Sequence, residues 1–242
     1  MSGYVDLHAH HLFAVDDGAP DLATGVEMVT TVAALGFSQL YVTPHQRSGM
    51  FMPTRQAIDS ARAELNETLR GNGGPTLGLG FENFWDEVLL ERISGGVIPS
   101  YDDGPAFLFE VNTGVMPSGI ERTLFDLRLK GKLPVMAHPE RYAAIQNQIE
   151  RAEPLGRTAA MVIDLAALDG AHGKAEMRTA RRLLQDGLVH AAATDIHRPE
   201  DGRAIAAGMA WIRKQLGPAA LDTLLDENPR RILAGDLPET LR

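Results

Sequence analysis

The amino-acid sequence predicts an α/β protein in which seven parallel strands, each followed by a helix, form a barrel within one domain. Short apolar segments alternate with longer segments of helical periodicity, which is typical of repeated βα units around a parallel sheet. The 242 residues, 44% hydrophobic and 23% charged, are common values for a single α/β barrel. No internal repeat or low-complexity linker divides the chain, so residues 1–242 are expected to form one domain.

The expected strands are short apolar runs, as in parallel sheets that helices cover on both faces. In chain order they span Tyr4–Leu7, Gln39–Thr43, Thr76–Phe81, Ala106–Phe109, Pro134–Ala137, Ala159–Leu165 and Leu188–Thr194. Seven such strands fit a barrel better than a small open sheet.

Helices are expected between the strands, because capping residues and glycines punctuate the intervening segments. Asp21 can cap a helix that ends before Gly36. Further helices are expected over Pro53–Leu69, between Ser118 and Gly131, and over Lys174–Gln185.

Composition argues against several classes of function. The net charge of −9 and the pI of about 5.3 disfavour a nucleic-acid surface, which needs clustered Lys and Arg. Cysteine is absent, so disulfides and thiolate-bound metals are excluded. No targeting segment is recognisable, and no apolar run approaches the roughly 20 residues that span a bilayer. A cytoplasmic protein without membrane insertion is therefore expected.

Potential metal ligands follow six of the seven expected strands. In chain order they are His8 and His10, His45, Glu82, Glu110, His138, and finally Asp195 with His197. The carboxyl ends of parallel strands lie on one face of such a fold, so these side chains are expected to converge there.

The residue types and spacing favour a multinuclear metal site. His8 and His10 are two residues apart, as are Asp195 and His197, so both members of each pair can face one ion if the segment is extended. Imidazole and carboxylate together suit zinc, iron or manganese, and the number of ligands exceeds the needs of one ion. A single His-x-His pair is more often ordinary structure. The joint placement of eight candidates argues against that reading.

The other histidines are expected to be structural or to face solvent. His11 would point away from His10, His172 falls in a loop or helix start, and His190 lies early in a strand.

Three arginines lie close to the candidate ligands in the sequence. Arg47 follows His45, Arg141 follows His138, and Arg203 comes shortly after His197. A guanidinium group suits the binding of phosphate oxygens, although each arginine alone could equally form a surface salt bridge. Their joint placement beside the ligands favours an anionic substrate.

Five motifs resemble one known group of enzymes. They are Asp6-Leu7-His8-Ala9-His10, Asp16-Asp17-Gly18, Thr43-Pro44-His45, Pro134 to Tyr142 with its His-Pro-Glu-Arg-Tyr ending, and Thr194-Asp195-Ile196-His197. Together they resemble the polymerase and histidinol phosphatase superfamily, in particular its bacterial tyrosine-protein phosphatase branch associated with capsular and extracellular polysaccharide synthesis. The resemblance extends from residue 4 to the Asn228-Pro229-Arg230 tail.

The resemblance implies a distorted, seven-stranded, TIM-like barrel that holds three divalent metal ions. Manganese is the expected metal, with iron, zinc or cobalt as alternatives. The implied ligand sets are His8, His10, Glu82 and Asp195 for one ion, Glu110 and His138 with a shared Glu82 for the second, and Asp17, His45 and His197 for the third. Spacing alone makes Asp16 as plausible as Asp17. The resemblance also implies that Arg141 and Arg203 act in catalysis and that Arg47, Arg141 and Arg203 bind the substrate phosphate.

The activity implied is hydrolysis of phosphotyrosine on a protein, expected to be a bacterial tyrosine kinase of polysaccharide synthesis. A small-molecule phosphatase of the histidinol-phosphatase type has the same ligand pattern and stays an alternative. A catalytically silent scaffold is a further alternative, which the retained ligands disfavour. The segment Asp164-Leu165-Ala166-Ala167 departs from the polar Asn-Ser-like strand end typical of the family, which leaves substrate preference open. Oligomeric state cannot be read from the sequence.

Overall fold

The structure, a computed structural model, describes residues 3–70 and 74–241, and all its strand pairs are parallel. The strands are β1 (Tyr4–Ala9), β2 (Phe37–Val42), β3 (His45–Gln46), β4 (Thr76–Leu79), β5 (Glu82–Phe84), β6 (Ala106–Glu110), β7 (Leu133–Ala137), β8 (Ala160–Asp164) and β9 (Ala191–Ala193). They form one sheet of order β1-β2-β4 and another of order β3-β5-β6-β7-β8-β9. The prediction of an α/β fold built on parallel strands is confirmed.

Two short strands, β3 and β5, begin after the ends of the second and third predicted strands and were not predicted; they belong to the other sheet. The chain leaves the first sheet between β2 and β3 at Pro44, which has no backbone N–H to donate to a neighbouring strand. It does so again between β4 and β5 after Gly80, where a Cβ atom would lie 2.6 Å from the ring of Tyr101. Both of these points lie just before a candidate ligand.

The segment that follows β9 pairs with the carboxyl end of β1. The backbone N–H of Asp195 donates to the carbonyl of His8 at 2.8 Å, and that of His10 donates to the carbonyl of Ile196 at 3.1 Å. These bonds bring the first and last ligand-bearing segments together, although they are almost 190 residues apart in sequence.

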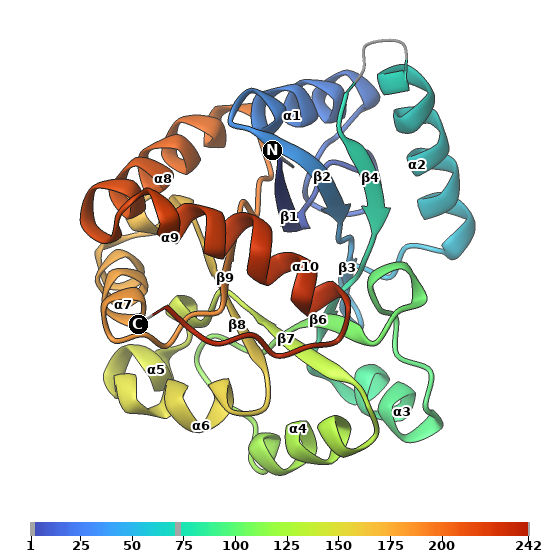
Figure 1. The fold of residues 1–242 in the computed structure, drawn as a ribbon. Helices are drawn as coiled ribbons and strands as arrows, with labels where there is room; N and C mark the ends of the chain where they lie inside the picture. Colours follow the sequence, from blue (N-terminus) through green and yellow to red (C-terminus); the bar gives the residue numbers. More distant parts are fainter. Residues whose placement is uncertain (1–2, 71–73, 242) are drawn as a thin grey trace.

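Helices surround the strands (Figure 1), and α1, α2, α4 and α7 lie where the sequence predicts helices. They are α1 (Leu22–Ala34), α2 (Arg55–Arg70), α3 (Glu87–Gly95), α4 (Ile120–Leu129), α5 (Ala143–Asn147), α6 (Ala152–Gly156), α7 (Lys174–Gln185), α8 (Gly202–Leu216), α9 (Pro218–Asp222) and α10 (Asn228–Leu233). Asp21 caps α1 by accepting a hydrogen bond from the N–H of Thr24. Within the described ranges, no helix combines the length and apolar character needed to cross a bilayer.

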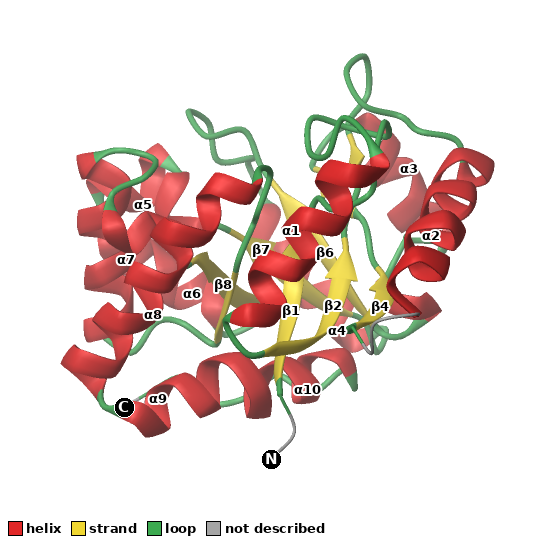
Figure 2. Ribbon diagram, turned by 90° about the horizontal axis from the view of Figure 1, so that it is seen from above, coloured by secondary structure: helices red, strands yellow, loops and turns green. Residues whose placement is uncertain are grey.

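Two separate clusters of buried residues lie on the two sides of the strands. The inner cluster contains Val5 and Leu7 of β1, alternate residues of β6 to β9, and Ile232 of α10. The outer cluster joins the opposite faces of the strands to the helices. Helices α9 and α10 lie beside the end at which the strands begin (Figure 2). The opposite end, where the strands finish, carries the candidate site.

Along β6 and β8, the side chains on the face of the inner cluster change from apolar to acidic towards the carboxyl end. On β6, Ala106 and Leu108 belong to the inner cluster, and Glu110 occupies the next position of the same alternation. On β8, Val162 is followed in the same way by Asp164. The core is thus apolar at the start of these strands and becomes acidic at their carboxyl ends.

His190 is structural, as predicted, and should make stability sensitive to acid. It is buried, its Nδ1 accepts the N–H of Met161 at 3.0 Å, and burial lowers its pKa to about 4. Because the folded-state pKa lies below the unfolded value of 6.5, the stabilisation is present above pH 6.5. It is lost as the pH falls towards 4, by up to about 3 kcal/mol. Urea unfolding of the wild type and His190→Gln between pH 7 and pH 4 should show a shallower decline for the variant; parallel curves would contradict this role.

Candidate metal centre

All nine predicted metal ligands come together at the carboxyl ends of the strands. Their ligand atoms form four overlapping groups, in each of which the atoms lie within 4.8 Å of one another. The groups are His10, Asp17, His45 and His197; His8, His10 and Glu82; His8, His138 and Asp195; and His45, Glu82 and Glu110. Residues spread over most of the chain therefore build one continuous cluster.

Glu82, the first residue of β5, lies at the centre of this cluster and is 1% exposed. Its Oε2 lies 3.1 Å from His8 Nε2, 3.4 Å from His10 Nε2 and 3.0 Å from His45 Nδ1. Its Oε1 lies 2.9 Å from His138 Nε2. One carboxylate thus contacts four imidazoles from three segments, the position of a ligand shared between ions.

The spacing of these atoms fits metal coordination. Among the described residues, Glu82 Oε2 and His45 Nδ1 are buried without a hydrogen-bond partner, although they lie close to each other. The Nε2 atoms of His8 and His10 are 3.1 Å apart. Ligand atoms at about 2.0–2.1 Å from a tetrahedral ion are roughly 3.3 Å from one another, close to the separations found here. These lone pairs therefore converge as they would around a cation.

The electrostatics of the cluster favour positive charge. Burial opposes protonation of His10, but Asp16, Asp195 and Glu82 outweigh it and raise the pKa of this imidazole well above its ordinary value. Hydrogen bonds from His197 and His45 hold the pKa of Asp17 below its ordinary range. Four buried or half-buried carboxylates beside five imidazoles, which bind a metal once they give up their extra proton, form a donor set suited to divalent cations that accept nitrogen and oxygen ligands.

Two of the candidate ligands adopt a backbone conformation that side chains rarely take. His138 has φ of 34° and Asp195 has φ of 48°, both in the left-handed region. The His138 N–H donates to the carbonyl of Val162 at 2.8 Å, which helps to hold this geometry. Such local strain persists where surrounding contacts enforce it, and it is frequent at functional sites.

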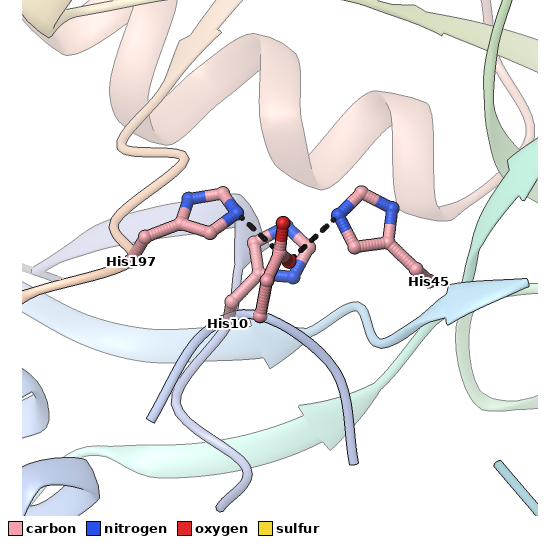
Figure 3. Close-up of side chains that lie close together, drawn as sticks. His10, His45 and His197 are labelled. Carbon is pink, nitrogen blue, oxygen red and sulfur yellow. Dashed lines mark ion pairs between the residues drawn. The ribbon is translucent and has the colours of Figure 1, made fainter. Parts of the chain in front are cut away.

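The structure distinguishes the two aspartates that spacing left equivalent. Asp16 Oδ2 accepts hydrogen bonds from His10 Nδ1 at 2.9 Å and from the backbone N–H of His45 at 3.2 Å. Asp17 instead faces His45 Nε2 at 3.2 Å and His197 Nε2 at 3.5 Å. Asp16 therefore orients the His10 imidazole and the backbone at His45, whereas Asp17 joins the candidate ligand group whose histidines Figure 3 labels.

Gly18 is required by the packing of this loop. A Cβ atom at Gly18 would lie 2.2 Å from the carbonyl oxygen of His10 and 2.5 Å from its Cβ. The Gly18 N–H also donates to Asp16 Oδ1 at 3.0 Å. The Asp-Asp-Gly motif thus combines an orienting carboxylate, a candidate ligand and the one residue small enough to pack against His10.

Asp6 stabilises the two segments that carry His8 and Asp195. It belongs to the first sequence motif, but no sequence pattern assigned it a role. Its Oδ2 accepts the hydroxyl of Thr194 at 2.6 Å, and its Oδ1 accepts the N–H groups of Thr194 and His8. Burial raises the pKa of Asp6 to about 6, and these hydrogen bonds oppose the rise. The residue ties the first strand to the last just beneath His8 and Asp195.

Arg141 belongs to an ion-pair network on one side of the cluster. Its Nη2 donates to Asp195 Oδ2 at 2.5 Å and to Asp164 Oδ2 at 2.7 Å, and it lies 3.2 Å from His172 Nε2. The carboxylates outweigh the effect of burial and raise the pKa of Arg141 above its already high value. Glu140 supports the same region, because its Oε1 accepts the backbone N–H of Asp164.

The other two predicted arginines lie differently. Arg47 places its guanidinium over the Phe84 ring, 4.2 Å from the centroid. Arg203 is exposed in the first turn of α8. Arg198, which no sequence motif indicated, lines the cavity beside the cluster. Its position directly after His197 was the available signal.

The remaining histidines differ in outcome. His11 is buried, burial lowers its pKa to about 3, and neither ring nitrogen has a hydrogen-bond partner in the described part of the chain. His172 is exposed, in agreement with the expectation that it is structural or faces solvent. It also contacts Asp164 and Arg141.

A cavity of about 430 Å³ opens beside the cluster. It is lined by candidate ligands Asp17, Asp195 and His197 and by cationic groups of Arg141, His172 and Arg198, together with Ala166, Ala171, Thr194 and Asp201. The side chains of Asp17 and His197 are 52% and 26% exposed, so the cluster is accessible on this flank. An anion entering here would meet positive groups beside the candidate metal ligands.

Parallel strands whose carboxyl ends gather histidines, aspartates and glutamates around an accessible cavity define the class of metal-dependent hydrolases. The family model described as capsular polysaccharide synthesis, CpsB/CapC, matches residues 4–234. The chain belongs to this family. The expected resemblance to bacterial tyrosine-protein phosphatases is confirmed.

Individual relatives agree with this assignment over nearly their whole length. The chain is 28% identical to the tyrosine-protein phosphatase YwqE of Bacillus subtilis (strain 168) over 232 residues, which cover 95% of this chain and 91% of YwqE. It is 26% identical to the tyrosine-protein phosphatase CpsB of Streptococcus pneumoniae, with 96% and 99% of the two chains covered.

Solved structures are similar as well. A chain from the crystal structures of YwqE from Bacillus subtilis and CpsB from Streptococcus pneumoniae, described as unique metal-dependent tyrosine phosphatases, superposes with a TM-score of 0.85 at 27% identity. The superposition covers 98% of this chain and 99% of the other. The phosphotriesterase homology protein of Escherichia coli shares the fold alone, with a TM-score of 0.55 at 11% identity.

Proposed function

We propose that this protein is a metal-dependent protein-tyrosine phosphatase. The observation that carries the proposal is the convergence of all nine predicted ligands beside a cavity that Arg141 also lines. The full-length similarity to proteins named tyrosine-protein phosphatases supports phosphotyrosine as the substrate. Exposure of Asp17 and His197 at the cavity supports a substrate carried on another protein.

Three divalent ions, with manganese expected, would occupy the cluster. His8, His10, Glu82 and Asp195 would hold the first, Glu82, Glu110 and His138 the second, and Asp17, His45 and His197 the third. The overlap of the four ligand groups at Glu82 and His10 supports closely spaced ions. When bound, such ions supply an activated water molecule as nucleophile and neutralise charge on the phosphoryl oxygens.

The protein itself would bind and orient the phosphoryl group. Asp164 and Asp195 hold Arg141 through its Nη2, and Nη1 has no partner among residues 3–70 and 74–241, so it can donate to a phosphate oxygen. Arg203 is solvent-exposed near the cavity-lining Asp201 and would contribute a second guanidinium in catalysis. Arg47 would help to bind the phosphate from the opposite side.

The physiological substrate would be a tyrosine-phosphorylated protein in the cytoplasm, with a bacterial tyrosine kinase of polysaccharide synthesis as the expected partner. The family description supports this setting. We further propose that the two sheets together form a single distorted barrel of seven strand positions, closed where β1 approaches Ile196.

Metal removal provides the direct test. Protein treated with a chelator should lose at least about 100-fold in turnover of a phosphotyrosyl peptide, and manganese should restore it, because charge stabilisation by the ions contributes several kcal/mol. Released phosphate and metal content by elemental analysis are measured on the same samples.

Histidinol phosphate, assayed in parallel, separates the protein phosphatase from a metabolite phosphatase. A higher kcat/KM for histidinol phosphate than for phosphotyrosyl peptides would overturn the proposed substrate. Activity that is indifferent to chelation would overturn the metal mechanism. A metal-poor protein without turnover of either substrate would instead indicate a silent scaffold.

A further inference from the structure

A histidine outside the metal cluster forms an acid–base pair at the edge of the site. His172 Nε2 hydrogen-bonds to Asp164 Oδ2, and the same nitrogen lies 3.2 Å from Nη2 of Arg141. Asp164 ends β8, is almost fully buried, and has its Oδ1 occupied by the N–H of Ala166 at 2.7 Å. The carboxylate is therefore held rigidly from the strand and orients the imidazole.

His172 is placed where a bound substrate would reach it. Its side chain is 36% exposed, and it lines the cavity of about 430 Å³ together with Asp17, Asp195 and His197. It also lines a second cavity of about 440 Å³ with Arg141, Gln146 and Glu176. Arg141 and His172 are the two residues common to both cavities, so they form the boundary between the candidate metal cluster and an adjoining hollow.

The free ring nitrogen of His172 is available for proton transfer. In the described part of the chain, Nδ1 has no hydrogen-bond partner, because the contacts of the ring to Asp164 and Arg141 are made through Nε2. An imidazole whose one nitrogen is bound by a carboxylate and whose other nitrogen is free is the usual arrangement of a catalytic histidine.

The charged groups around His172 favour its protonated form. The hydrogen bond to Asp164 is the largest influence and raises its pKa, partial burial and the positive charge of Arg141 oppose the rise, and Asp195 adds to it. Glu176 of α7 faces the same hollow and contributes negative charge. The imidazolium form of His172 can therefore be present near neutral pH, although its positive charge and that of Arg141 repel each other.

We propose that His172 is the general acid that protonates the oxygen of the leaving tyrosine. This inference rests on the proposed phosphatase function and adds to it the proton donor. As the nucleophilic oxygen forms its bond to phosphorus, the bond from phosphorus to the tyrosine oxygen breaks, and its electron pair stays on that oxygen. The Nδ1 proton of His172 transfers to the same oxygen, which yields tyrosine, inorganic phosphate and a neutral imidazole that solvent protonates again.

A different role would be binding of the phosphate by His172 as a second cation beside Arg141. The two roles differ in what they depend on. A general acid matters more as the leaving group becomes more basic, whereas a phosphate-binding group affects all phosphate esters equally because they share the same phosphoryl oxygens.

The test compares leaving groups in the manganese-loaded enzyme. For His172→Gln, which retains a polar side chain, kcat/KM for phenyl phosphate should fall about 100-fold, the lower end of the range that a general acid contributes. For p-nitrophenyl phosphate, whose leaving group is much less basic, it should fall less than about 3-fold. The wild type should lose activity on phenyl phosphate at alkaline pH as His172 deprotonates, and the variant should lack that decline.

Two further variants make the result interpretable. Lys174→Gln, on the exposed first residue of α7, is the matched control and should match the wild type on both esters. His172→Asn repeats the test with a shorter side chain, and circular dichroism and metal content establish that each variant is folded and loaded.

The possible outcomes separate this inference from the proposed function. Equal losses on both esters in His172→Gln and His172→Asn, or activity unchanged on both, would overturn the general-acid role while leaving the phosphatase function intact. A wild-type enzyme that releases no phosphate from either ester with manganese would overturn the proposed function, and the role of His172 with it.

Discussion

Replacing Glu82 by glutamine is expected to lower phosphatase turnover on the order of 10³-fold or more and to reduce the bound metal. The glutamine has the same shape, but its amide nitrogen cannot act as a ligand and its oxygen carries no net charge. Because Glu82 lies within 3.4 Å of ring nitrogens of His8, His10, His45 and His138, the change affects every ligand group in which the carboxylate takes part. Turnover of p-nitrophenyl phosphate and elemental analysis measure the two effects.

Glu91→Gln is the matched control for this substitution, because it makes the same chemical change at an exposed position of α3. It should retain both activity and metal content. A Glu82→Gln protein that keeps its full metal content and loses less than about 10-fold in turnover would show that Glu82 is a buried structural carboxylate and not a shared ligand.

Arg141→Ala is expected to have the second-largest effect, because it changes both catalysis and stability. Loss of a donor to the phosphoryl oxygens should lower kcat/KM about 10²- to 10³-fold. The same change removes the cationic partner of Asp164 and Asp195, both almost fully buried, which should lower the free energy of unfolding by about 3–5 kcal/mol. Steady-state kinetics and urea unfolding at pH 7 measure the two consequences.

Arg141→Lys separates these consequences. The ammonium group keeps a positive charge between the aspartates and should recover most of the stability, but it lacks the planar pair of donors and should stay about 10²-fold impaired. Arg213→Lys, an exposed position of α8, is the control and should behave as the wild type. Full activity in Arg141→Lys would contradict donation from Nη1 of Arg141 to the phosphate while Nη2 is held by the two aspartates.

Much of the fold followed from local patterns that tertiary contacts did not override. Apolar segments predicted β1, β2, β4 and β6 to β9, and helix α7 begins and ends at the predicted residues. The short strands β3 and β5 were not predicted, although Pro44 and Gly80 were visible. An apolar run does not reveal whether the chain stays in one sheet, because that depends on which neighbours accept its hydrogen bonds.

The ligands could be predicted because their chemistry and position are both encoded locally. A polar residue directly after a buried strand reaches the same end of a parallel fold whatever the details of packing, so His8, Glu82 and Asp195 could be selected without coordinates. Their assignment to three separate ions came from family resemblance, and it stays a proposal that the overlapping ligand groups support.

The supporting residues could not be predicted, because they depend on contacts between distant segments. Asp6 reaches Thr194 across the gap between the first and last strands, and His172 reaches Asp164 and Arg141 from the loop before α7. Side chains of this kind carry no characteristic spacing. Only the folded chain brings them within hydrogen-bonding distance.

The sequence by itself determined an α/β protein with a cluster of nitrogen and oxygen ligands at its strand ends, since strand periodicity and the order of residues along each strand are local properties. The tertiary structure distinguishes Asp16 from Asp17, because the two carboxylates of one loop point to different partners. It also decided that Arg141 is held by two buried aspartates and that His172 lies beside it. The directions of these side chains and the distances between their segments are fixed only when the strands pack side by side.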